Sequence, residues 1–370
     1  MDARYDVRDI DSLLSPSLLF FGEIIDANIR RALELSGDDP SRLRPHVKTH
    51  KTPEIVRREL AVGITKHKCA TLREAQMLAE VGAPDVLIAY QMVGPNAGAL
   101  AALMAEHPET EFKSVVDDIG AAEALGAAMQ RAGLTAKVMI DLDVGMNRTG
   151  IAADESALDL YRALTKIAGL EAVGLHAYDG HNRAKDVAER NRACDDILAV
   201  VRGMRDTLEG EGIAAPLLVM GGTPPFPYYA LQEDVEASPG TFVLHDGAYG
   251  DGLPDLGFTP AAILLSRVIS RPLPRLACLD LGHKAIGADP AGDRGRVLNV
   301  PGAKLRGQSE EHWVLELTDE STRDSLKVGS PVFVCPTHIC PTVALHKSAH
   351  LVEGGVVTAE WQVAARDRLG

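Results

Sequence analysis

Several basic side chains lie close together in the stretch Arg44–Ile55, which reads RPHVKTHKTPEI. Lys48 lies between His46 and His50, and Pro53 suits the first turn of a helix, where its missing N–H costs no hydrogen bond. If Lys48 ends a strand that faces into an α/β barrel, neighbouring cations and partial burial favour the uncharged amine, the nucleophile of Schiff-base chemistry. Taken alone, such a stretch is more often a solvated basic turn.

Other chemically useful residues follow further apolar runs. Arg148 comes after AKVMIDLDV, and the segment GLHAYDGH carries His176, Tyr178 and His181. Two turns rich in small residues, MGGTPP and SPGT, could expose backbone N–H groups to a phosphate. Each feature alone is common on protein surfaces. A lysine, an arginine, an aromatic ring and two anion-binding turns at successive strand ends together predict a pyridoxal phosphate site.

A second cluster occupies Cys335–His346, which reads CPTHICPTVALH. If this segment is a strand, His338 and Cys340 point to the same face, because side chains alternate with a period of two. Imidazole and thiolate together suit Zn²⁺ with open positions for water or substrate. Without further context, a buried structural cysteine beside a hydrogen-bonded histidine is the commoner arrangement. We interpret Cys335 as a core residue.

The elements that must position these residues can be read from the hydrophobic pattern. Short apolar runs alternate with amphipathic helical patterns between about residues 43 and 250. The candidate strands are LRPHVKT, GITKHKCA, DVLIAY, EFKSVV, AKVMIDLDV, EAVGLHAYDG, PLLVMGG and TFVLHDGA. Eight such strands, most followed by a helix, predict an α/β chain with a (β/α)8 TIM-type barrel. No GxGxxG motif follows any of them, so a dinucleotide-binding fold has no support.

After residue 250 the helical periodicity fades, and strand-like runs alternate with Gly, Pro and Asp turns. We therefore expect a pyridoxal phosphate-binding barrel over residues 19–250 and a mostly β, metal-binding C-terminal domain over residues 251–370. Residues 1–18 precede the first barrel element and are expected to pack on the C-terminal domain.

Composition excludes several classes of partner. The formal net charge of −14 argues against a nucleic-acid or anionic-membrane surface. Five cysteines without a CxxC pair fit a reducing compartment. The N-terminal residues show no signal-peptide pattern, and no apolar stretch is long enough to span a membrane. We expect a cytoplasmic protein.

Taken together, RPHVKTHK, DVGMNRTG, GLHAYDGH, the GGT turn, SPGT and THICPTVAL resemble motifs of the D-threonine aldolase and D-serine dehydratase family. The resemblance runs from about residue 15 to residue 368. These are fold-type III, alanine racemase-like enzymes that depend on pyridoxal phosphate and a divalent metal. The resemblance implies a lyase acting on a D-3-hydroxy amino acid, and a homodimer in which each C-terminal domain abuts the partner's barrel.

The resemblance also implies roles for single residues. Lys48 would be catalytic and carry the cofactor, Arg148 would contact the cofactor's phenolic oxygen, and His176 and Tyr178 would lie near its ring. The residues expected to hold the phosphate are Gly222, Thr223, Gly240 and Thr241. His338, also catalytic, and Cys340 would bind the metal, either Zn²⁺ or Mn²⁺.

Two motifs favour different reactions. Cys340 completes a His-x-Cys pattern typical of the dehydratases, whereas the aldolases often have His-x-Asp. The HAYDG segment resembles the aldolases, because the dehydratases have a tyrosine where His176 stands. GGTPP also departs from the commoner GSTGT-like turn. We expect a D-threonine aldolase that forms glycine and an aldehyde, with a D-serine or D-threo-3-hydroxyaspartate dehydratase as the alternative.

Two further classes find less support. An amino-acid racemase would need a second base on the opposite face of the cofactor, and we identify no tyrosine for that role in the C-terminal part. A non-catalytic pyridoxal phosphate carrier would resemble the barrel alone, without about 120 further residues that carry a metal motif.

Overall fold

A computed structural model describes residues 2–368 and divides them into two compact units. The unit that we call the barrel unit contains residues 32–48 and 56–240, with the last described residues of the chain. The unit that we call the β unit contains residues 2–31, 49–55 and 241–366. The chain therefore passes between the units several times. The domain boundaries expected from the sequence are a separate division and remain a prediction.

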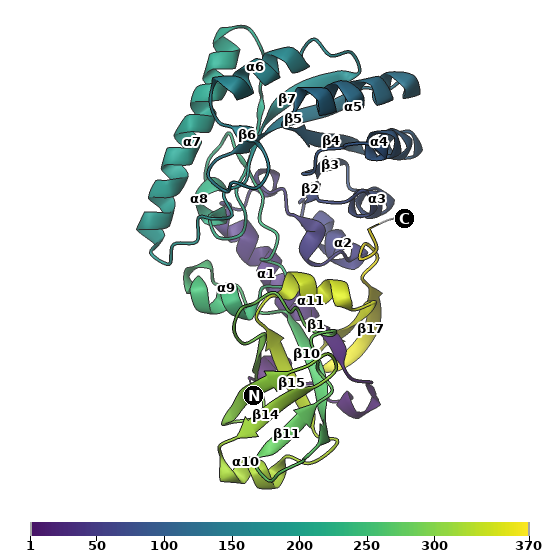
Figure 1. The fold of residues 1–370 in the computed structure, drawn as a ribbon, viewed down its shortest axis with the longest axis vertical. Helices are drawn as coiled ribbons and strands as arrows, with labels where there is room; N and C mark the ends of the chain where they lie inside the picture. The colour runs from purple at the N-terminus through teal and green to yellow at the C-terminus, as the bar shows by residue number, and fades with distance from the viewer. Residues whose placement is uncertain (1, 369–370) are drawn as a thin grey trace. The chain divides into compact units, whose positions relative to one another are not determined.

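The barrel unit is a curled parallel sheet with helices on its outer side (Figure 1). Its strand order is β2-β3-β4-β5-β7-β8-β9, and the short β6 pairs with β5. The strands are β2 Lys66–Cys69, β3 Asp85–Ile88, β4 Glu111–Val116, β5 Ala136–Asp143, β6 Ile151–Ala152, β7 Leu170–Ala177, β8 Leu217–Met220 and β9 Glu236–Ala237. The helices are α2 Pro53–Ala61, which begins in the β unit, α3 Leu72–Glu80, α4 Pro95–Glu106, α5 Ile119–Ala132, α6 Glu155–Leu164, α7 Val187–Gly210 and α8 Phe226–Tyr229.

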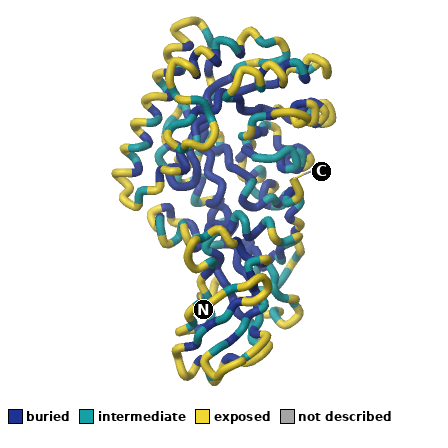
Figure 2. Tube along the Cα trace, in the orientation of Figure 1, coloured by how far each residue is buried: buried dark blue, intermediate teal, exposed yellow. Residues whose placement is uncertain are grey.

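Part of the core of the barrel unit is an apolar cluster to which five neighbouring strands each contribute an aliphatic side chain. One buried cluster contains Leu87, Val115, Met139, Val173 and Val219. Strands covered on both faces need nearly continuous hydrophobic runs, and such runs make these strands recognisable in the sequence. Figure 2 shows the strands buried and the outer turns of the helices exposed.

The prediction of an α/β barrel followed by a mostly β part is confirmed, but the ends of the barrel differ from the expected strands. LRPHVKT forms only two isolated parallel bridges, Leu43 with Ala237 and His46 with Lys68. Pro45 accepts a bond from the N–H of Lys68 but has no N–H to continue that ladder. TFVLHDGA forms no strand, and β9 takes the last position in the sheet.

The β unit is a nine-stranded sheet with the order β13-β14-β11-β10-β1-β16-β17. β15 pairs with both β10 and β12. The strands are β1 Ser17–Phe21, β10 Ala262–Ser270, β11 Leu276–Leu279, β12 Gly295–Val297, β13 Ala303–Gln308, β14 Trp313–Leu317, β15 Pro331–Pro336, β16 Ser348–Glu353 and β17 Val356–Gln362. β1 lies between β10 and β16, so the opening of the chain is built into this sheet.

Few helices accompany the β unit. They are α1 Gly22–Leu35, which continues into the barrel unit, α9 Gly247–Gly252, α10 Glu320–Ser325 and α11 Ile339–Leu345. Short 3₁₀ turns are η1 Ala3–Tyr5, η2 Ile10–Ser12, η3 Pro40–Arg42, η4 Val47–Thr49 and η5 Pro254–Leu256. Within residues 2–368, every helix is too short or too polar to cross a bilayer.

Candidate active site

Lys48 lies in the turn η4, two residues after the bridge between His46 and β2. The backbone N–H of Lys48 donates to Nδ1 of His46 at 3.3 Å, which fixes the turn. The side chain is half-buried, and its Nζ lies 5.5 Å from the centroid of the Tyr178 ring. The expected strand end is thus a 3₁₀ turn, but Lys48 and Tyr178 lie close together as the sequence suggested.

Tyr178 is the common neighbour of several cations in the barrel unit. It follows β7, and Arg148 follows β5 in the loop that ends at β6. The Arg148 guanidinium carbon lies 5.1 Å from the Tyr178 ring centroid, and Nζ of Lys68, in β2, lies 5.8 Å from it. With Lys48, three basic side chains from different elements of the barrel unit lie near one ring. Such an arrangement attracts an anion.

Glycine residues make room for the Tyr178 ring. A Cβ atom at Gly222 would lie 2.8 Å from Tyr178 Cε2, and one at Gly180 would lie 2.4 Å from the same ring. Thr223 Oγ1 accepts a hydrogen bond from the Gly240 N–H at 3.1 Å, so the two predicted phosphate-binding turns meet. Cations, an aromatic ring and closely approaching glycine turns fit an anionic, planar cofactor such as pyridoxal phosphate.

Thr241 has different contacts from the other residues expected at the phosphate. It belongs to the β unit, where its Oγ1 lies 3.7 Å from Sγ of Cys340. Its part in phosphate binding remains a prediction.

A buried chain of polar side chains near Tyr178 was not recognised as a unit in the sequence. His176 Nδ1 lies 2.6 Å from Oδ1 of Asp141, and His176 Nε2 lies 3.4 Å from Nζ of Lys68. Burial, and then the charge of Lys48, lower the pKa of Lys68 to about 7. Burial and the neighbouring Lys68 also lower the pKa of His176. The signal available in the sequence was the run KHKC, which places a lysine inside a barrel strand.

The segment that carries His338 and Cys340 is not a strand. β15 ends at Pro336, His338 is the N-cap of α11, and Cys340 lies in the first turn of that helix. Pro341 explains the difference, because proline is tolerated in the first helical turn and disfavoured inside a sheet. The predicted strand is therefore wrong, although the side chains of His338 and Cys340 are in contact.

The surroundings of His338 and Cys340 leave donor atoms for a metal. His338 Nδ1 is hydrogen-bonded to Oδ2 of Asp289, so Nε2, once it has lost its proton, is the ring nitrogen that could bind an ion. Contact with Cys340, then Asp289, raises the pKa of His338 to about 9 despite partial burial. Cys340 Sγ lies 3.3 Å from Oγ1 of Thr49. Within residues 2–368, no group of three or more His, Cys, Asp or Glu side chains could hold a metal, so water or substrate would have to complete this donor pair.

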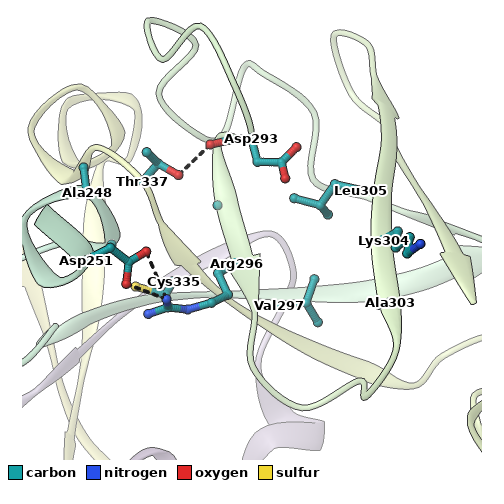
Figure 3. A pocket seen from close by; sticks show the side chains of 12 residues that line it. Ala248, Asp251, Asp293, Arg296, Val297, Ala303, Lys304, Leu305, Cys335 and Thr337 are labelled. Atoms are coloured by element: carbon teal, nitrogen blue, oxygen red, sulfur yellow. Dashed lines mark hydrogen bonds and ion pairs between the residues drawn. The ribbon is translucent and has the colours of Figure 1, made fainter. Parts of the chain in front are cut away.

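A hollow of about 680 Å³ in the β unit adjoins this motif without including His338 or Cys340 (Figure 3). Thr337 lines it and donates to the carbonyl of Asp293 at 2.6 Å. Arg296 and Asp251 form an ion pair at 2.9 Å on its wall. None of the residues predicted to do chemistry lines this hollow.

The fold is that of an alanine racemase-like barrel, and several basic side chains lie near Tyr178 at its strand ends. Residues 23–244 match the family model described as alanine racemase, N-terminal domain, and residues 261–352 match the putative serine dehydratase domain. The chain therefore belongs to the D-threonine aldolase and D-serine dehydratase family of pyridoxal phosphate-dependent lyases.

Individual relatives agree with this membership. A D-threonine aldolase from Arthrobacter sp. is 30% identical, with 95% of this chain and 92% of the relative covered. A D-threo-3-hydroxyaspartate dehydratase from Delftia sp. is 26% identical, with 95% and 98% covered. The crystal structure of D-threonine aldolase from Filomicrobium marinum superposes with a TM-score of 0.88 at 28% identity, with 96% of each chain covered.

Proposed function

We propose that the protein is a pyridoxal phosphate- and divalent metal-dependent lyase that cleaves D-3-hydroxy amino acids, with D-threonine giving glycine and acetaldehyde. The observation that carries this proposal is the 30% identity to the Arthrobacter D-threonine aldolase over 95% of the chain. His176 in the aldolase-like HAYDG segment supports the choice of an aldolase.

The barrel unit would hold the cofactor, which when bound supplies an electron acceptor for the bond that breaks at Cα. The residues of this unit proposed to hold it are Lys48, Arg148, His176, Tyr178, Gly222, Thr223 and Gly240. Thr241, which belongs to the β unit, is proposed as a phosphate-binding residue on the resemblance alone. Arg148 would supply a positive charge to the cofactor's phenolic oxygen, and Tyr178 would lie near the cofactor ring. After Cα–Cβ cleavage, the Cα atom of glycine must gain a proton, and Nζ of Lys48 is the group that we propose to donate it.

The β unit would hold the metal through His338 and Cys340, and Zn²⁺ or Mn²⁺ there would act as a Lewis acid toward the substrate's β-hydroxyl. Asp289 accepts a hydrogen bond from Nδ1–H of His338 and would so fix the ring tautomer in which Nε2 can bind an ion. Loss of the hydroxyl proton and cleavage of the Cα–Cβ bond then release the aldehyde.

A dehydratase is the second candidate, because Cys340 completes the His-x-Cys pattern and the Delftia relative is a dehydratase. In this reaction Nζ of Lys48 would remove the proton from Cα and hydroxide would leave from Cβ. The products would be a 2-oxo acid and ammonia. Both candidates use the same residues, and they differ in which bond at Cα breaks.

Product analysis tests the proposal. The purified protein is incubated with pyridoxal phosphate, Zn²⁺ or Mn²⁺, and D-threonine or D-serine, with L-threonine as the stereochemical control. Glycine and acetaldehyde from D-threonine would support the aldolase, whereas ammonia and a 2-oxo acid would replace it by the dehydratase. Formation of the L-enantiomer alone would favour the racemase.

Two variants test the roles of single residues. Lys48→Ala is expected to lose the visible absorbance of lysine-bound cofactor, and retention of that absorbance would contradict the role of Lys48. His338→Ala is expected to keep the absorbance and lose metal-dependent turnover. Full activity after chelation would remove the metal from the proposal. The proposed homodimer can be checked by light scattering of the purified protein.

A further inference from the structure

Lys68 is a buried lysine whose amine has no carboxylate partner among residues 2–368. Its exposed fraction is 2%, and its side chain is hydrogen-bonded to His176 Nε2 at 3.4 Å. Other buried cations of the barrel unit are paired differently. Arg44 contacts Asp85 and Glu236, each at 2.6 Å, and Lys113 contacts Asp85 at 2.9 Å and also Glu111. A buried charge is costly unless it is paired, so Lys68 is either uncharged or awaits an anion.

His176 is the hydrogen-bond acceptor for Lys68 when no ligand is bound. Asp141 Oδ1 lies 2.6 Å from Nδ1 of His176 and holds the proton on that nitrogen. Nε2 of the neutral ring is then an acceptor, and it can receive an N–H from Lys68 in either charge state of the amine. Asp141 is already engaged by His176, so its carboxylate reaches Lys68 only through the ring.

The charged groups around Lys68 have opposite effects on its pKa. Burial is the largest influence on its pKa, and the positive charges of Lys48 and Arg44 act in the same downward direction. The carboxylates of Asp141 and Asp179 act upward and do not compensate, so the pKa is about 7. The pKa of His176 is also lowered, so this ring stays neutral near pH 7 and adds no charge.

The location of Lys68 indicates which anion could pair with it. Its Nζ lies 5.8 Å from the centroid of the Tyr178 ring, around which Lys48 and Arg148 also lie. An anionic ligand that lies against Tyr178 is therefore within electrostatic reach of Lys68.

We propose that Lys68 is a further cofactor-binding residue, which takes up a proton from solvent when pyridoxal phosphate binds and pairs as an ammonium with an anionic oxygen of the cofactor. This inference rests on the proposed function for the identity of the cofactor. It does not depend on whether the enzyme is an aldolase or a dehydratase.

Proton uptake during cofactor binding tests the inference without measuring activity. Full-length protein freed of cofactor is titrated with pyridoxal phosphate by calorimetry at about pH 8, in buffers that differ in their enthalpy of ionisation. We expect the wild type to take up about one proton more per site than Lys68→Met. Absorbance titrations should show the wild-type Kd rising with pH above about 7.5 by up to roughly tenfold per pH unit, with a flatter profile in the variant.

Two further variants make the test specific. Lys68→Arg keeps a permanent positive charge, so it should retain affinity and lose the extra proton uptake. Lys113→Met removes another buried lysine of the same unit and should leave proton uptake unchanged. Circular dichroism of each variant establishes that it is folded.

Equal proton uptake and equal Kd profiles in wild type and Lys68→Met would overturn the inference. The inference would also be overturned if Lys68→Met took up as many protons as the wild type and lost only turnover. Lys68 would then be an acid–base group of the reaction. Cofactor binding with Lys68-linked uptake but without lyase products would refute the proposed function and leave this inference intact. Failure of the wild type to bind pyridoxal phosphate would refute both.

Discussion

Arg44 should contribute strongly to the stability of the barrel unit. Its side chain is fully buried and bonds two carboxylates, those of Asp85 and Glu236, each at 2.6 Å. Asp85 begins β3 and Glu236 begins β9, so the cluster lies at the end of the barrel opposite the carboxyl ends of the strands. Arg44→Met removes the charge and keeps an unbranched side chain. In this variant Asp85 still has an ion pair with Lys113, and Glu236 still has one with Lys66.

The expected loss follows from this partial compensation. Removing one partner of a buried ion pair costs about 3–5 kcal/mol, and the remaining lysines place this variant near about 3 kcal/mol, or roughly a hundredfold in the unfolding equilibrium. Arg162→Met is the matched control. Arg162 also contacts several acids, namely Glu155, Asp159 and Glu211, but on the surface, so a much smaller loss is expected.

Urea unfolding followed by far-ultraviolet circular dichroism measures the loss. Tryptophan fluorescence follows the unfolding of the β unit separately, because Trp313 and Trp361 both belong to that unit. A loss below about 1 kcal/mol for Arg44→Met, or an equal loss for Arg162→Met, would refute the reasoning from burial.

Acid titration gives an independent check on the same cluster. Burial would raise the pKa of Asp85, but bonds to Arg44 and Lys113 outweigh it and lower the pKa to about 2. Because this folded-state pKa lies below the ordinary value, the stabilisation is present above about pH 4 and lost as the pH falls toward 2, by about 2 kcal/mol. Arg44→Met should show a smaller loss over this range.

Three further predictions concern other sites. Burial lowers the pKa of His245 to about 4. The free energy of unfolding of the β unit should therefore fall by about 3 kcal/mol as the pH falls from about 6.5 to 4. In urea unfolding followed by tryptophan fluorescence, His245→Asn should not show this fall. Gly222→Ala should weaken cofactor binding in absorbance titrations, because its Cβ would lie 2.8 Å from the tyrosine ring, whereas Gly203→Ala, with open space around it, should not. Asp289→Ala should weaken Zn²⁺ binding by about 10- to 100-fold in a metal titration, because the proposed histidine ligand loses its orienting partner, and an unchanged affinity would contradict that role.

The sequence by itself determined the class of the fold and the neighbourhood of Tyr178. Strands buried on both faces need continuous apolar runs, and this local requirement is visible without any tertiary contact. The carboxyl ends of parallel strands meet at one end of a barrel, so residues placed there, such as Lys48 and Arg148, could be expected near Tyr178. The proximity of Lys48 and Arg148 to Tyr178 therefore followed from chain order, whereas their roles in the reaction remain predictions.

Two prolines make the local structure differ from the predicted strands. Pro341 makes the segment after His338 begin a helix, although the alternation of residue types suggested a strand. Pro45 removes an N–H from the predicted first barrel strand, which is reduced to isolated bridges. In both places the backbone constraint of proline overrides the pattern of residue types.

Only the tertiary structure decided which polar side chains meet inside the barrel. Lys68, Asp141 and His176 lie on three different strands, and their contacts depend on the register of β5 with β7 and on the closure of the sheet through His46. The same holds for Arg44 between Asp85 and Glu236, which are far apart in the sequence. Strand registry is a non-local property, set by the packing of the whole sheet, so the partner of a buried charge cannot be read from the spacing of residues along the chain.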